Sequence, residues 1–157
     1  MITRLGVKPA LILGLVLTAI GLFWFAQISP DGSYVGDILF PALISAFGLG
    51  FAFVSMTVGA VAGVDGHEAG LASGMINTSQ QVGGALGLAI LAAVANSRTD
   101  SVAEAGSSMP VALTEGFQTA LMVGAGFAIV GAILAFLLVD SIETEADVDG
   151  ELVPVTT

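Results

Sequence analysis

Four stretches of this chain contain no charged side chain and are long enough to cross a bilayer: 10–28, 38–64, 69–97 and 116–139. A spanning helix needs about 20 apolar residues, which cover about 30 Å of hydrocarbon. Only 10% of the 157 residues are charged and the mean hydropathy is +0.98, values that a soluble domain of this size could not bury. We therefore predict an all-α membrane protein with four transmembrane helices, at about 10–28, 36–64, 69–97 and 116–139.

The segments outside the spans indicate how the chain is oriented. Arg4 and Lys8 lie in residues 1–9, a predicted loop, and the positive-inside rule places this loop in the cytoplasm. An even number of spans returns residues 140–157 to the same side, where this acidic segment is expected to be a disordered tail. We expect a multi-pass protein of the plasma membrane with both termini in the cytoplasm, and Arg98 outside.

Several function classes find no support in the composition. Three basic residues against 13 acidic ones offer no patch for nucleic acid. The absence of cysteine removes thiolate metal sites, and the single histidine, His67, is expected to be a solvated loop residue. Ser73 lacks the G-x-S-x-G spacing of a nucleophile elbow, so we find no catalytic constellation and expect no enzyme activity, metal or cofactor.

Polar residues interrupt the third span. On a helical wheel the residues of one face, about 120° wide, are small or polar. They are Gly70, Ser73, Gly74, Asn77, Gln80, Gln81 and Gly84. Amides need hydrogen-bonding partners that lipid does not supply, so this face should meet either another helix or water. Ser73, Asn77, Gln80 and Gln81 are therefore candidates for interhelical contacts or for a polar pathway.

Small residues at four-residue spacing occur on all four spans and favour close helix packing. Gly59 with Gly63 and Gly83 with Gly87 form GxxxG pairs, Ala10, Gly14 and Thr18 form a similar ladder, and Gly124 with Ala128 and Ala132 continues the pattern. Gly70, Gly74 and Gly84 of the face described above are further candidates for helix packing. Pro41 should bend the second span. The segment 98–115 is expected to be a polar loop that holds a short helical piece starting at Pro110.

Three segments resemble a known transporter family. The segment AGLASGMINTSQQVGGALGLAIL resembles the penultimate helix of the fourteen-helix drug:proton antiporters of the major facilitator superfamily, the EmrB/QacA-like multidrug efflux branch. The preceding GFAFVSMTVGAVAGVDGHEAG resembles the helix and loop before it. RLGVKP resembles a cytoplasmic loop motif of the superfamily, with Arg4, Gly6 and Lys8 in register and Thr3 in place of the motif's acid.

This resemblance covers about residues 3–140 and implies the last four helices of a longer transporter, part of a major-facilitator helix bundle. It implies proton-coupled export of small hydrophobic or cationic drugs by alternating access, with the remaining helices and the lipid bilayer as partners. The four charge-free runs carry no ionisable side chain, although proton-driven transporters use such groups, so this portion is expected to be inactive alone. The alternative is a free-standing four-helix membrane protein, either a small oligomeric transporter or an accessory or structural subunit.

Overall fold

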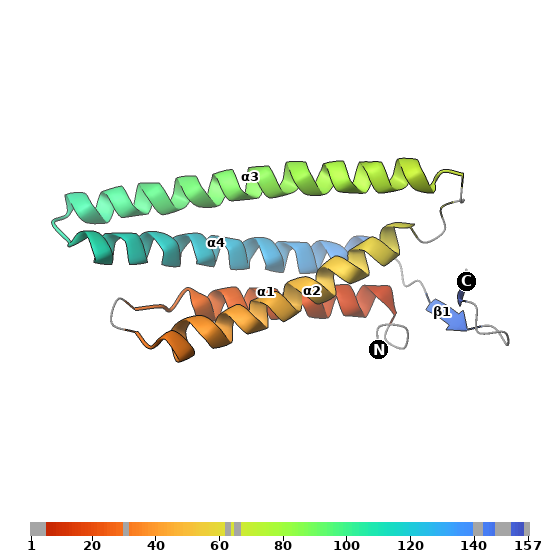
Figure 1. Ribbon diagram of the computed structural model, residues 1–157, viewed down its shortest axis with the longest axis horizontal. Coiled ribbons are helices and arrows are strands. Elements are labelled where there is room, and N and C mark those ends of the chain that lie inside the picture. Colours follow the sequence, from red (N-terminus) through yellow and green to blue (C-terminus); the bar gives the residue numbers. More distant parts are fainter. Residues whose placement is uncertain are drawn as a thin grey trace.

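The computed structural model describes residues 6–29, 32–61, 64, 67–139, 143–146 and 152–155. Among these residues, four long helices lie side by side (Figure 1). They are α1 (Val7–Phe25), α2 (Phe40–Val61, preceded by the π-helical turn η2, Tyr34–Leu39), α3 (Ala69–Glu104) and α4 (Met109–Leu138). All four are long and apolar enough to cross a bilayer, which confirms the predicted fold class of an all-α membrane protein with four spanning helices.

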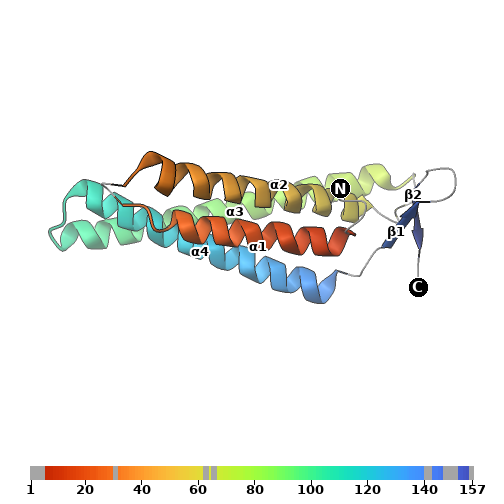
Figure 2. The ribbon, with the colours of Figure 1, turned by 90° about the horizontal axis from the view of Figure 1, so that it is seen from below.

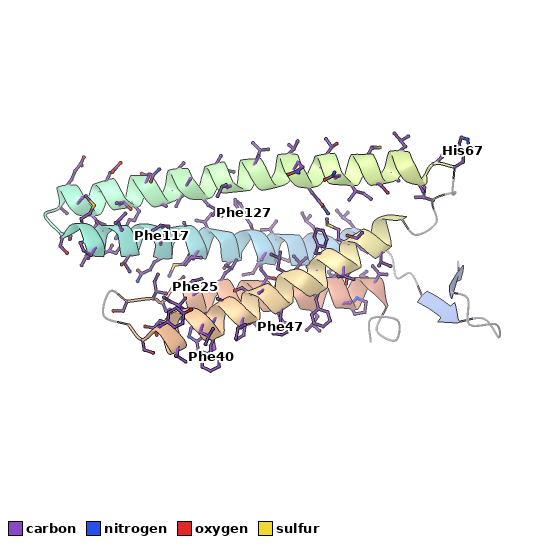
Figure 3. The ribbon with its side chains drawn as sticks, viewed as in Figure 1. Phe25, Phe40, Phe47, His67, Phe117 and Phe127 are labelled. Carbon is purple, nitrogen blue, oxygen red and sulfur yellow. The ribbon has the colours of Figure 1, made fainter. Side chains whose placement is uncertain are left out.

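The helices are not packed equally on one another. α1 lies between α2 and α4 and packs closely on both, whereas α3 packs mainly on α4 and has few contacts with α2 (Figures 1 and 2). The beginning of α1 and the end of α4 lie at the same end of the molecule, where Lys8 Nζ is 5.4 Å from the centroid of the Phe136 ring. Large apolar side chains such as Phe47 and Phe117 point outward, as lipid-facing residues would (Figure 3).

The closest packing in the described residues joins α1 and α2. A Cβ added at Gly14 would lie 2.5 Å from the amide nitrogen of Ala52, and one added at Gly48 would lie 2.7 Å from the carbonyl oxygen of Gly14. Thr18 is buried in this contact and donates its hydroxyl hydrogen to the Gly14 carbonyl at 2.8 Å. The predicted packing role of the small-residue ladder on the first span is thus confirmed.

Pro41 marks a change of helix type at the start of the second span. The π-helical turn ends at Leu39, and the α-helix begins at Phe40. Proline lacks the amide hydrogen that an α-helix needs and its ring crowds the preceding turn, so a wider turn before it is physically reasonable. Ser45 donates its hydroxyl hydrogen to the Pro41 carbonyl at 2.8 Å. The bend that we expected at Pro41 stays a prediction, because Pro41 lies in the first turn of α2 rather than inside it.

The segment 98–115 is not the polar loop that we expected. α3 continues to Glu104 and α4 begins at Met109, with Pro110 in its first turn, so only residues 105–108 connect the two helices. Gly106 adopts a φ of 92°, which favours glycine and lets the chain reverse within four residues. Polar residues end a membrane span but do not end a helix, because water tolerates helical backbone as well as loop.

The tail also contains regular structure. Strands β1 (Glu143–Ala146) and β2 (Leu152–Val155) pair antiparallel, with Glu143 opposite Val155. The acidic composition of this segment predicts disorder instead. Val153 and Val155 of β2 are β-branched and favour the extended backbone of a strand, a preference that net charge does not reflect. The rest of residues 140–157 lies outside the described structure.

Candidate functional site: the polar face of α3

The four polar candidates lie together on the first half of α3. Ser73, Asn77 and Gln81 are exposed, and Gln80 is half-buried. Within the described part of the chain, none of these four side chains makes a hydrogen bond to another helix. Thr78, next to them, donates to the carbonyl of Gly74 at 2.9 Å, one turn earlier. The polar face is thus formed by one helix, and none of the four side chains is paired with another helix among the described residues.

The small residues of this face are also without neighbours. A Cβ added to any of five glycines would meet no described atom within 4 Å: Gly70, Gly74, Gly83, Gly84 and Gly87. Their predicted packing therefore does not occur against α1, α2 or α4, and it stays a prediction for a partner outside the described residues. Gly59 differs, because a Cβ there would lie 2.8 Å from Cγ1 of Val7. Arg4 and Gly63 lie outside the described residues.

The reason for this open face is the place where α3 meets α4. A Cβ added at Gly116 of α4 would lie 2.6 Å from the carbonyl oxygen of Ala95 and would also clash with the Thr99 hydroxyl. The single buried residue recorded for α3 is Val102, close to its end. The two helices are therefore held together mainly along the second half of α3, which leaves the first half free.

α3 thus presents two different exposed surfaces at membrane depth. Its apolar stripe includes Met75, Val82 and Leu86, each more than half exposed. Its polar face, roughly opposite, includes Asn77 and Gln81. Lipid suits the apolar stripe, whereas an unpaired amide in hydrocarbon costs several kcal/mol. The polar face must therefore meet water or polar groups of another protein segment when the helix is in a bilayer.

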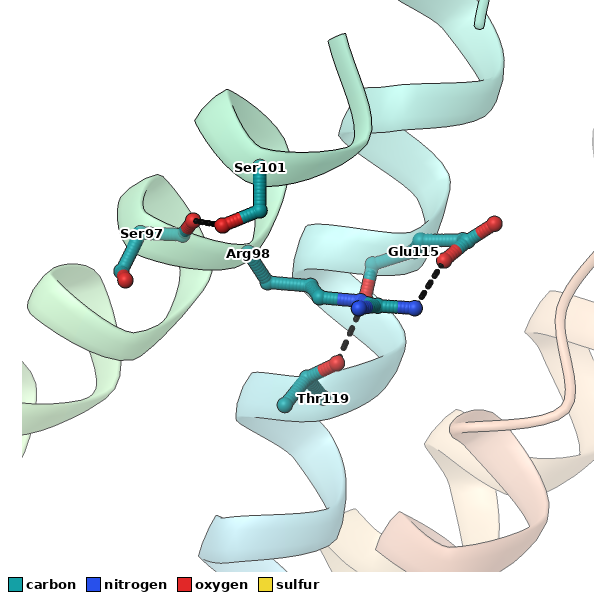
Figure 4. Close-up of polar contacts among 5 residues, drawn as sticks. All are labelled: Ser97, Arg98, Ser101, Glu115 and Thr119. Atoms are coloured by element: carbon teal, nitrogen blue, oxygen red, sulfur yellow. Dashed lines mark hydrogen bonds and ion pairs between the residues drawn. The ribbon is translucent and has the colours of Figure 1, made fainter. Parts of the chain in front are cut away.

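A second polar cluster, which the sequence analysis missed, joins α3 to α4 at the other end. Arg98 Nη2 donates to Glu115 Oε2 at 2.6 Å, and Thr119 donates its hydroxyl hydrogen to the Glu115 carbonyl at 2.8 Å (Figure 4). Gln118 Nε2 donates to the carbonyl of Ile28 at 2.5 Å and so links α4 to the residues after α1. The sequence signal for the ion pair is that Arg98 directly follows the third charge-free run and the oppositely charged Glu115 directly precedes the fourth.

The ion pair is expected to contribute little to stability. The side chains of Arg98 and Glu115 are 50% and 35% exposed, and exposed pairs contribute about 0.2 to 1 kcal/mol. Replacing Glu115 by glutamine should lower the free energy of unfolding by less than about 1 kcal/mol. A double-mutant cycle with Arg98→Gln measures this coupling, and a coupling energy above about 2 kcal/mol would show that the pair is shielded from water.

The loop motif and the histidine are placed without forming a site. Gly6 precedes α1 with a φ of 76°, a backbone conformation that favours glycine. Lys8 lies in the first turn of α1, where its ammonium group faces the Phe136 ring. His67 is exposed in the turn before α3 (Figure 3). Among the described residues no group of three or more His, Cys, Asp or Glu side chains is placed to hold a metal ion.

Comparison with known proteins shows two relatives concerned with antibiotics. The chain is 29% identical over 156 residues to the puromycin resistance protein pur8 of Streptomyces alboniger, a match that covers 96% of this chain and 31% of that protein. It is 40% identical over 86 residues to the cephamycin export protein CmcT of Amycolatopsis lactamdurans, covering 55% of this chain and 18% of that protein. No family model matches the chain, and no solved structure matches it with significance.

The chain thus spans about a third or less of the length of these curated relatives. Both relatives are named for antibiotic export or resistance. The four described helices that are able to span a membrane, together with this similarity, indicate a multi-pass membrane protein.

Proposed function

We propose that the chain is the C-terminal portion of a proton-coupled multidrug efflux transporter of the major facilitator superfamily, in its fourteen-helix EmrB/QacA-like branch. The similarity to an antibiotic export protein and an antibiotic resistance protein, both much longer than this chain, carries the proposal. Transport is by alternating access, in which helix bundles rock around a central site. The charge-free runs of the four helices carry no acid for proton coupling, so this portion is inactive without the remaining helices.

The polar face of α3 is the part of this chain that takes part in transport. Among the described residues its amides make no hydrogen bond to α1, α2 or α4, and lipid cannot satisfy them. In the whole transporter, Asn77, Gln80 and Gln81 line a polar pathway, and the neighbouring glycines let a substrate or another helix approach the backbone. The apolar stripe with Val82 and Leu86 faces lipid or other apolar helices.

The proposed substrates are small hydrophobic or cationic compounds. The names of the two relatives, which mention a cephamycin and puromycin, support antibiotics among them. The protein lies in the plasma membrane, with Lys8 at the cytoplasmic end of α1 and Arg98 near the outer end of α3. This orientation rests on the positive-inside rule and on the even number of spans. The acidic residues after α4 then lie in the cytoplasm.

Accumulation of a fluorescent cationic dye in the host tests the function. Cells that lack the gene should retain more dye than cells that carry it, because one export route has been removed. A protonophore should raise the retention of the wild type to that of the deletion strain, since export depends on the proton gradient. The same measurement is made with a panel of compounds that includes puromycin and a cephamycin. If the two strains retain equal amounts of every compound, the proposal is contradicted.

A further inference from the structure

An apolar groove runs between α1 and α4. Its volume is about 600 Å³, and no charged side chain lines it. Its lining includes Ile12, Ala19 and Phe23 from α1 and Ala125, Ile133 and Phe136 from α4. Buried alanines form its floor, whereas its large side chains are exposed. Such a channel fits a flexible hydrocarbon chain.

One end of the groove carries a positive charge. Lys8 Nζ lies 5.4 Å from the centroid of the Phe136 ring, and Phe136 lines the groove. The chain has only three basic residues and a formal net charge of −10, so a cation at this place is not part of a general basic surface. Because Lys8 is half-buried, its methylene groups cover apolar surface while its ammonium group stays at the end of the groove.

The two ends of α1 match the two faces of a bilayer. Trp24, which is 43% exposed, lies 16 residues after Lys8, which is about 24 Å along a helix. Tryptophan is enriched at the boundary between hydrocarbon and headgroups, and lysine near a helix end reaches toward the headgroups. Lys8 therefore lies at headgroup depth, and the groove between Ile12 and Phe23 extends through the hydrocarbon below it.

We propose that this groove binds one anionic phospholipid, with an acyl chain between α1 and α4 and its phosphate paired with the Lys8 ammonium. Charge selects the headgroup and the apolar lining holds the chain. This site is separate from the polar face of α3 and does not depend on the proposed transport function. It depends only on the chain being in a membrane.

Photo-crosslinking in the intact host membrane tests the occupant. A photoreactive phenylalanine analogue at Ile133, inside the groove, should yield adducts enriched in phosphatidylglycerol. The same analogue at Leu88 of α3, which is 71% exposed, should yield adducts with the average composition of the bilayer. Adducts of the same lipid composition at both positions, or adducts of Ile133 with a protein, would overturn the proposal.

A second measurement tests the role of the charge with the full chain, so that the acidic tail is present. The protein is placed in nanodiscs of phosphatidylcholine with a minor fraction of phosphatidylglycerol, and the lipids retained after mild extraction are counted by mass spectrometry. Lys8→Gln should lower the preference for phosphatidylglycerol about fivefold, the effect of one cation near an anionic surface. Lys8→Arg should keep the preference, and an unchanged preference in Lys8→Gln would overturn the proposal.

Discussion

Replacing Gly48 by leucine is expected to separate α1 from α2 and to leave little folded protein in the membrane. A Cβ at this position would lie 2.7 Å from both the Gly14 carbonyl oxygen and the Thr18 hydroxyl, and it would also clash with the Thr18 amide nitrogen. Backbone atoms of a packed helix cannot move aside cheaply, and overpacking of a core costs about 1 to 3 kcal/mol or more. For Gly48→Leu we expect a loss of stability of about 3 kcal/mol.

Size-exclusion chromatography of a fluorescent fusion after detergent extraction measures this effect. The wild type should elute as one symmetric peak, and Gly48→Leu should elute mostly in the void volume. Gly50→Leu is the matched control, because it makes the same change two residues later on α2, where an added Cβ would meet no described atom within 4 Å. If the two variants elute alike, the close α1–α2 contact does not hold the helices together.

The second large effect is expected at Gln81 in a transporter that contains this chain. Gln81→Leu should leave expression unchanged and shift the relative resistance to a cationic and a neutral compound by up to about tenfold. A hydrogen bond contributes about 0.5 to 1.5 kcal/mol, and 1.4 kcal/mol corresponds to a tenfold change. Val82→Leu, on the apolar stripe of the same helix, is the control and should change neither the expression nor the relative resistance to the two compounds.

Thiol labelling separates a pathway from a packed interface. The chain contains no cysteine, so Asn77→Cys and Leu86→Cys each introduce a single thiol. The thiolate is the reactive form and needs water, so Asn77→Cys should react with an aqueous reagent and Leu86→Cys should not. If neither thiol reacts, the polar face is sealed against another helix, and a change in drug profile at Gln81 would then have to be indirect.

The membrane spans could be predicted from the sequence because the cost of a charge in hydrocarbon is large and local. The charge-free runs therefore located all four helices. Helix ends outside the lipid have no such signal, so α3 extends to Glu104 and α4 starts at Met109, both inside the segment expected to be a loop. The strands of the tail were not predicted either, because acidic composition indicates disorder and does not reflect the strand propensity of individual residues.

The identity of the polar face could also be predicted, since helical periodicity alone brings Asn77, Gln80 and Gln81 to one side. The segments that contact this face could not be predicted from the sequence. Glycine and alanine occur on every span, so their spacing indicates close packing without saying which faces meet. The ladder with Gly14 does pack within this chain, whereas the glycines around Asn77 do not. Only the arrangement of the helices distinguishes the two.

The apparent mass of the protein in its native host tests the central claim most directly. A tag is placed chromosomally on the C-terminus, and membranes are analysed by denaturing electrophoresis and immunoblotting. We predict a band far heavier than the 15.7 kDa of this chain, because the remaining helices of the transporter belong to the same polypeptide. A stable band near 15.7 kDa would contradict this account and would favour a free-standing four-helix membrane protein.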